Sequence, residues 1–257
     1  MADAWLDAHE EDHTGPAASL NQYWYSAATI TALIDVVQEE AISAHGKHPS
    51  MAQLDCAFVS TPSLFFALSP SQRTRCRVFD FDTLLGEGEP HFVHYDFNKP
   101  RDLPQELCGA FKLVVVDPPF ITAEVWRQYS ETVRLLRGEG GSIILTTVIE
   151  NAPLLDSLLG VQPRRFLPSI PNLPYQYATY TNFDSPRLAM RNPEVPHDPD
   201  ALIEAARCSS QSSRESKHVE ADRPINGAGA AYDFDEMVRR AEQAEAAAMG
   251  AAGAATG

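Results

Sequence analysis

The chain has 257 residues, four cysteines and a formal net charge of −15 at pH 7. This length accommodates one α/β domain with additional segments, and the lack of a run of ~20 apolar residues argues against a membrane span. No cluster of Lys and Arg offers a surface for a phosphate backbone, and no C-x-x-C pair suggests a metal site or a disulfide framework. The acidic N-terminus resembles no targeting signal, so we expect a cytoplasmic protein. Because the basic cluster and the cysteine pair are lacking, we expect it to bind neither nucleic acid nor a metal.

Three segments differ in composition. Residues 1–19 are acidic and rich in small residues, which is typical of disorder. Residues 20–185 carry the alternating apolar runs of a folded domain. Residues 186–257 resemble a low-complexity extension, within which the Ala- and Glu-rich stretch 234–248 predicts a helix.

The folded part begins with adjacent aromatic residues that include Trp24 and Tyr25. They cannot all occupy one face of a helix, so they either pack the first helix onto a sheet or face a ligand. From Ala27 to Glu40 the apolar residues recur at helical spacing. A first helix is therefore expected over this stretch.

The first strand is predicted over residues 54–59 and is followed by Ser60, Thr61, Pro62 and Ser63. Hydroxyl residues with a proline are typical of a helix start. The turn after the first strand of a nucleotide-binding sheet usually contains glycines, and here there are none. The backbone N–H groups of this turn remain available to a carboxylate.

Two more strands are predicted at residues 77–81 and 91–95, and each ends at an acid. Asp80 is suited to accept hydrogen bonds from a ribose diol. Asp96 is suited to accept from an adenine amino group, with Phe97 against the ring. The alternatives are an ordinary strand end at Asp80 and a turn cap at Asp96. The link between the two strands is too short for a full crossover helix, so about one helical turn is expected.

A fourth strand, residues 113–116, leads directly into Asp117, Pro118, Pro119 and Phe120. Asp117 can accept a hydrogen bond from an amine N–H, and the prolines fix φ and supply carbonyls without competing donors. Phe120 can stack on a planar base or face a cation. These four residues would position an amine for methyl transfer; the alternative is a strand end followed by a turn. Asp117 is interpreted as orienting the amine rather than as a strong base.

The remaining elements are predicted in a regular alternation. Helices are expected at 124–136 and 153–159, and strands at 142–148, 165–168 and 175–183. Prolines make the loop 168–174 stiff, and it is either a substrate clamp or a plain connector. Together these elements predict an α/β, Rossmann-like sheet of seven strands, mostly parallel, with an antiparallel C-terminal strand.

Several segments of the chain match a known pattern in order and spacing. They are NQYWYS (21–26), FVSTPS (58–63), VFDFD (78–82), YDFN (95–98), DLP (102–104), DPPF (117–120), SETV (130–133) and LGV (159–161). With them the chain resembles the seven-stranded methyltransferases and, more closely, the lysine methyltransferases that act on translation elongation factor 1-alpha. That family was once labelled as putative adenine-specific DNA methyltransferases because of the same four-residue motif.

The resemblance covers about residues 20–185 and implies a function and a site. The implied activity is S-adenosyl-L-methionine-dependent methylation of a lysine on elongation factor 1-alpha. The implied roles are ribose binding by Asp80, adenine binding by Asp96, methionine binding by Ser60 and Pro62, amine binding by Asp117, Pro118, Pro119 and Phe120, and closure over the cofactor or the lysine by Trp24 and Tyr25. Phe120 replaces the tyrosine of many members, and the segment 170–175 departs from the family's loop.

Two other functions remain open from the residues alone. An adenine exocyclic-amine methyltransferase on DNA or RNA uses the same motif, but it needs basic clamps or a base-flipping loop. A non-enzymatic scaffold that has lost the cofactor is supported only by the glycine-free turn. Neither the target lysine nor the oligomeric state follows from the sequence.

Overall fold

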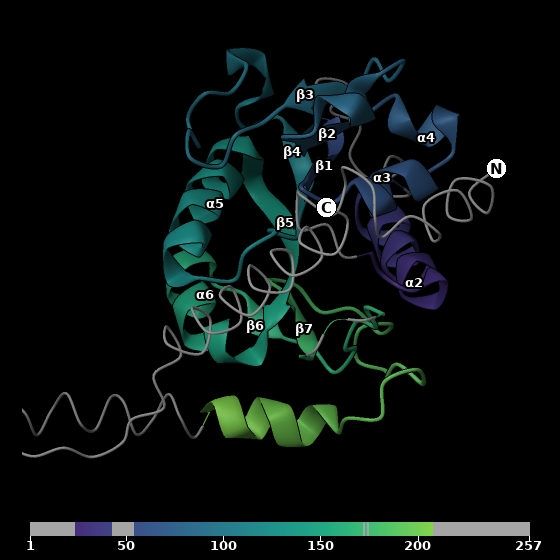
Figure 1. Ribbon diagram of the computed structural model, residues 1–257, viewed down its shortest axis with the longest axis vertical. Helices are drawn as coiled ribbons and strands as arrows, with labels where there is room; N and C mark the ends of the chain where they lie inside the picture. The colour runs from purple at the N-terminus through teal and green to yellow at the C-terminus, as the bar shows by residue number, and fades with distance from the viewer. Residues whose placement is uncertain (1–23, 43–53, 172, 174, 208–257) are drawn as a thin grey trace, which may run out of the picture. The chain divides into compact units, whose positions relative to one another are not determined.

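The computed structural model describes residues 24–42, 54–171, 173 and 175–207. In this part of the chain the strands form one sheet in the order β3-β2-β1-β4-β5-β7-β6 (Figure 1). The strands are β1 (Leu54–Val59), β2 (Cys76–Asp80), β3 (Phe92–His94), β4 (Phe111–Val116), β5 (Arg137–Val148), β6 (Gln162–Pro163) and β7 (Tyr177–Thr181). Strands β1 to β5 pair in parallel, and β7 pairs antiparallel with β5 and β6. The predicted fold class is confirmed.

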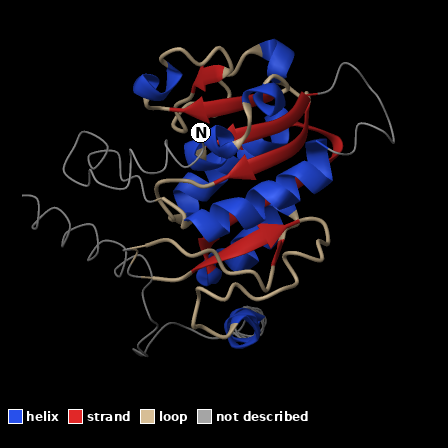
Figure 2. Cartoon of the chain, turned by 90° about the vertical axis from the view of Figure 1, so that its right-hand side faces the viewer, coloured by secondary structure: helices blue, strands red, loops and turns tan. Residues whose placement is uncertain are grey.

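Helices cover both faces of this sheet (Figures 1 and 2). They are α2 (Ala27–Val37), continued by a π-helical turn (Gln38–Ile42), α3 (Pro62–Ala67), α4 (Pro70–Arg73), α5 (Ala123–Leu136), α6 (Ala152–Leu159) and a helix over residues 199–207. Each α-helix predicted before residue 160 is present. Hydroxyl side chains begin two of them: Ser26 accepts from the N–H of Thr29 in α2, and Thr122 accepts from the N–H of Val125 in α5.

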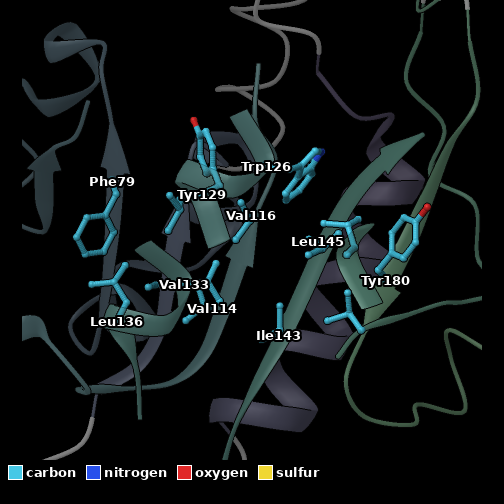
Figure 3. Packing of buried hydrophobic residues seen from close by; sticks show 14 of the residues in the cluster. Phe79, Val114, Val116, Trp126, Tyr129, Val133, Leu136, Ile143, Leu145 and Tyr180 are labelled. Carbon is cyan, nitrogen blue, oxygen red and sulfur yellow. The ribbon is translucent and has the colours of Figure 1, made fainter. Parts of the chain in front are cut away.

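Strand β4 shows why the sheet is buried on both sides. Val114 and Val116 point to the face covered by α5, where they join Trp126 in one apolar cluster (Figure 3). Leu113 and Val115 point to the opposite face and join the cluster that includes α2 and α3. Successive side chains of a strand alternate between faces, so a continuous apolar run fits a strand with helices on each side. The buried strand ends at the polar motif that begins with residue 117.

The link between β2 and β3 contains a single 3-10 turn (Thr83–Gly86), as the short spacing predicts. Gly86 lies directly against the ring of Phe92 at the start of β3. A Cβ atom on this glycine would stand 2.6 Å from Cδ1 of that ring. The turn therefore depends on a residue without a side chain.

The strand predicted at residues 165–168 is wrong. The sixth strand is the short β6 (Gln162–Pro163), and the chain then leaves the sheet. The N–H of Phe166 donates to the carbonyl of Leu188 at 3.0 Å, and the carbonyl of Leu167 accepts from Nδ2 of Asn192 at 2.9 Å. These backbone groups bond to a later segment of the chain rather than to a neighbouring strand.

That later segment extends the packed domain beyond residue 185, where the sequence interpretation ended it. The side chains of Leu188, Asn192 and Val195 are buried. Asn192 also donates to Oγ1 of Thr29 in α2 at 3.3 Å, and Ser26 donates to the carboxylate of Glu194 at 2.5 Å. Buried apolar contacts and hydrogen bonds thus fix this segment to α2. The predicted disorder at 1–19 and the predicted helix at 234–248 lie outside the described residues.

No helix in the described ranges is both long and apolar enough to cross a membrane. In the same ranges, no group of three or more His, Cys, Asp or Glu side chains is arranged to hold a metal ion.

Candidate active site

A cavity of about 380 Å³ opens at the carboxyl ends of β1, β2 and β4. This volume is within the usual range for small-molecule sites. It is lined by Trp24, Ser60, Thr61, Pro62, Ser63, Asp80, Phe81, Asp82, Tyr95, Asp96, Phe97, Asn98, Asp117, Pro118, Pro119, Phe120, Tyr129, Ile170, Leu173 and Tyr177. Every predicted site residue except Tyr25 is among them. Because parallel strands end at one edge of a sheet, residues far apart in sequence meet here.

The turn after β1 is shaped by Ser60, which has a φ of +52°. It is the only described residue other than glycine with a positive φ. Its N–H donates to the carbonyl of Phe79 at 2.8 Å, and its hydroxyl bonds the hydroxyl of Tyr129 at 2.8 Å. Ser60 therefore takes the conformation that a glycine usually supplies in this turn, and Pro62 then begins α3.

The two acids after β2 and β3 differ in their surroundings. Asp80 is buried and accepts from the N–H of Asp82 at 3.0 Å, and its burial raises its pKa to about 6. Asp96 accepts from the backbone N–H and from Nδ2 of Asn98, each at 3.0 Å, and the backbone bond lowers its pKa. Asp96 thus caps its turn, which was the alternative interpretation, and it also lines the cavity.

An aromatic wall links the third strand end to the four-residue motif. Phe97 stacks on Tyr129 with ring centres 5.7 Å apart and meets Phe120 edge-on at 6.2 Å. Tyr129 comes from α5 and is a functional residue that the sequence did not single out. A tyrosine hydroxyl on the buried face of a helix needs a hydrogen-bond partner. This requirement is the feature of the sequence that could have indicated a role for Tyr129 at the site.

Asp117 is held by groups that the sequence analysis did not assign to it. The β4–β5 register pairs Val116 with Leu145, so the next residues along the two strands, Asp117 and Thr146, are neighbours. Oγ1 of Thr146 donates to Oδ1 of Asp117 at 2.8 Å. Burial raises the pKa of Asp117 to about 7, although hydrogen bonds from Tyr25 and Thr146 oppose the shift. At that pKa the carboxylate is also a competent proton acceptor near neutral pH.

Tyr25 does not lie where the sequence interpretation placed it. Its side chain is buried behind the motif, with its hydroxyl 2.6 Å from Oγ1 of Thr146. It is not part of the cavity lining, whereas its neighbour Trp24 is. Closure over a ligand is therefore possible for Trp24 and not for Tyr25.

The charge of the cavity has one sign. Its described lining contains the carboxyl groups of Asp80, Asp82, Asp96 and Asp117, and none of these lining residues is a Lys, Arg or His. Such a field attracts a cation and repels a phosphate. A sulfonium and a protonated amine both fit this requirement.

The strand order, the acids after β2 and β3 and the Asp-Pro-Pro-Phe motif after β4 define this chain as a Rossmann-like methyltransferase. A family model described as probable N6-adenine methyltransferase matches residues 17–185, and the chain belongs to this family. EEF1A lysine methyltransferase 1 of Mus musculus is 35% identical over 174 residues, which cover 65% of this chain and 74% of that protein. The protein-lysine N-methyltransferase M142.8 of Caenorhabditis elegans is 30% identical over 173 residues, covering 65% and 78%.

The protein-lysine N-methyltransferase EFM5 of Saccharomyces cerevisiae is 31% identical over 124 residues, 46% of each chain. The resemblance inferred from the motifs is therefore confirmed. The chain is a methyltransferase of the class that depends on S-adenosyl-L-methionine, and the curated relatives named here are lysine rather than adenine methyltransferases. The cavity fits such a cofactor because buried and turn-bound acids line it and none of its described lining residues is a cation; Lys99, which lies 3.8 Å from Asp96, is outside the lining.

The pKa of Asp117 makes a prediction about folding stability. In the unfolded chain this carboxyl ionises near pH 4, but in the folded protein its pKa is about 7. The folded state therefore retains a proton that the unfolded state releases, and stability is lost as the pH rises from about 4 through 7. Asp117→Asn cannot ionise. It should be more stable than the wild type by about 2–4 kcal/mol at pH 8, with little difference at pH 4.

Urea denaturation at both pH values measures this difference. The exposed Asp102 supplies the control, because Asp102→Asn should follow the wild type at each pH. If Asp117→Asn is no more stable than the wild type at pH 8, ionisation of the buried Asp117 does not lower the stability of the folded state.

Proposed function

We propose that this protein transfers a methyl group from S-adenosyl-L-methionine to a lysine ε-amine of translation elongation factor 1-alpha, in the cytoplasm. The observation that carries the proposal is the position of Asp117, Pro118 and Phe120 in one acidic cavity with Asp80 and Asp96. The names of the relatives support the choice of substrate.

In this proposal the residues divide between cofactor and amine. Asp80 accepts hydrogen bonds from the ribose, Asp96 and Phe97 bind the adenine, and Ser60 and Pro62 meet the methionine end. Trp24, which lines the cavity, closes over the cofactor or the lysine. The cofactor supplies an electrophilic methyl group on a sulfonium sulfur. Asp117 to Phe120 hold the target nitrogen in line with that methyl group.

The amine must be neutral before it reacts, because a lysine ammonium has no lone pair. Ionised Asp117 accepts a hydrogen bond from the ammonium and then its proton, assisted by the low polarity of the cavity. The carbonyl of Pro118 accepts a second N–H. With its proton on Asp117 and an N–H held by Pro118, the nitrogen would direct its lone pair at the electrophilic methyl group that the bound cofactor would supply, and the leaving sulfur would keep the electron pair of the methyl–sulfur bond. The proton on Asp117 leaves to water after the products separate.

Partition of a radioactive methyl group tests the substrate class. The protein is incubated with tritiated S-adenosyl-L-methionine, unmethylated recombinant elongation factor 1-alpha, DNA and total RNA. We expect label that resists nucleases, is released by protease, and is lost with Asp117→Asn. Label confined to nucleic acid would overturn the proposal in favour of adenine methylation, and no cofactor-induced rise in melting temperature would favour a scaffold.

The assignment of Asp80 predicts a loss of cofactor affinity. Asp80→Asn removes a charged acceptor from a buried position, and a hydrogen bond to a charged group contributes about 1.5–3 kcal/mol. We expect the dissociation constant of S-adenosylhomocysteine to rise roughly 10- to 100-fold. Isothermal titration calorimetry measures it, with Asp102→Asn as the control. An unchanged constant would place the ribose elsewhere.

A further inference from the structure

Asp117 is the end of a short chain of hydroxyl groups that begins in front of α2. The hydroxyl of Tyr25 lies 2.6 Å from Oγ1 of Thr146, and Thr146 donates to Oδ1 of Asp117 at 2.8 Å. Both hydroxyl-bearing side chains are buried, with 5% of Tyr25 and 2% of Thr146 exposed. The three residues come from the segment before α2, from β5 and from the end of β4.

The direction of this chain follows from the number of hydrogen atoms. A threonine hydroxyl has one hydrogen, and in Thr146 it is directed to Asp117. The lone pairs of Thr146 can accept from the phenol of Tyr25, which lies 2.6 Å away and also hydrogen-bonds Asp117, so both hydroxyl groups are directed at the carboxylate. An ionised carboxylate only accepts hydrogen bonds, whereas a protonated one carries a donor of its own. Two hydroxyl donors directed at Asp117 favour its ionised form over its protonated form.

No cation among the described cavity residues helps to stabilise the ionised carboxylate of Asp117. The titratable groups that face Asp117 are the phenols of Tyr25 and Tyr129, from the segment before α2 and from α5. Tyr177 of β7 faces Tyr25, and Asp80 faces Tyr129. Burial disfavours the charged carboxylate. The hydroxyl groups of Tyr25 and Thr146 are the described contacts that oppose this effect of burial.

We propose that Tyr25 and Thr146 are positioning residues, which orient Asp117 and keep its carboxylate in the form that accepts the substrate amine. This inference rests on the proposed function. Neither residue touches the substrate in this account, since Tyr25 lies outside the cavity lining and both act through Asp117. The pair also explains why a tyrosine stands beside Trp24 without facing the cavity.

The pH dependence of kcat/KM separates this role from a merely structural one. The acid limb reports the ionisation of Asp117 in the free enzyme, near pH 7 for the wild type. Losing a hydrogen bond to the carboxylate raises its pKa, so Tyr25→Phe and Thr146→Val should move the limb up by about one to two pH units. The loss should be roughly 10- to 100-fold at pH 6 and small at pH 9.

Two further variants complete the experiment. Thr146→Ser keeps the hydroxyl and should restore the wild-type limb. Tyr180→Phe removes a buried phenol hydroxyl that donates to the carbonyl of Val148 at 2.8 Å, outside the cavity, and should leave the limb in place. Equal losses at every pH for Tyr25→Phe and Thr146→Val, with an unmoved limb, would overturn the proposal.

A titration without substrate keeps this test independent of the proposed function. With ¹³C-labelled aspartate carboxyls, the resonance of Asp117 is the one missing from Asp117→Asn. Its midpoint should rise in Tyr25→Phe and in Thr146→Val and stay in place in Tyr180→Phe. An unchanged midpoint overturns the positioning role, whereas a raised midpoint in a protein that does not methylate elongation factor 1-alpha overturns only the substrate assignment.

Discussion

Asp117→Asn is expected to lower kcat for methyl transfer by about 10²- to 10⁴-fold. Asparagine keeps the shape of the side chain but removes the negative charge and the proton acceptor. The hydroxyl of Thr146, which donates to Oδ1 in the wild type, will then bond to a neutral amide. Because Asp80 and Asp96 remain in place, the affinity for S-adenosylhomocysteine should stay within a few-fold of the wild type.

Initial rates at saturating cofactor and protein substrate, together with calorimetry, measure both quantities. Asp102→Asn is the matched control, because it makes the same chemical change at an exposed acid outside the cavity lining. A rate within a few-fold of the wild type would remove Asp117 from the chemical step. If the affinity for the cofactor fell to the same extent, Asp117 would bind the cofactor rather than the amine.

Leu188→Ala is expected to lower the free energy of unfolding by about 2–5 kcal/mol. This leucine lies in the segment predicted to be a low-complexity extension, yet it is fully buried in the apolar cluster of the α2 face. Truncation would leave a cavity in this apolar cluster. Guanidinium denaturation followed by circular dichroism measures the change.

Met190 provides the matched control two residues further on. Its side chain is 66% exposed, so Met190→Ala should change stability by no more than about 0.5 kcal/mol. If the two variants are equally stable, residues 186–195 contribute nothing to the core. The domain boundary would then return to residue 185.

The cavity acids were predictable because each follows an apolar run that can only be a buried strand. Asp117 is the clearest example: four apolar residues precede it and two prolines end the strand. The meeting of Asp80, Asp96 and Asp117 then follows from parallel pairing alone. Strand propensity and the prolines that end a strand are enough to predict the positions of such residues.

Thr146 and Tyr25 required information that is absent from the local sequence. Thr146 is one hydroxyl in an apolar strand, and only the register of β5 against β4 brings it to Asp117. The orientation of Tyr25 depends on where the chain before α2 is anchored, and the N–H of Ser26 is bound to the carbonyl of Ser169, far along the sequence. Long-range backbone contacts decided both positions.

The prediction for the segment after residue 185 was wrong for a different reason. The segment is rich in proline and charge. Its buried residues Leu188, Asn192 and Val195 have helical spacing, but one of them is polar and prolines at 186, 193 and 196 break any helix, so the spacing does not reveal the burial. The composition is therefore typical of a low-complexity extension. Its order comes from single contacts such as the two hydrogen bonds that Nδ2 of Asn192 donates, and a periodic pattern cannot predict such contacts.

A crystal structure of the protein with S-adenosylhomocysteine bound tests the central claim most directly, because the ligand's sulfur marks where the methyl group departs. We predict the ribose at Asp80, the adenine between Asp96 and Phe97, and the sulfur facing the space in front of Asp117 and Pro118. A ligand whose sulfur points away from Asp117, or which binds outside this cavity, would contradict the account.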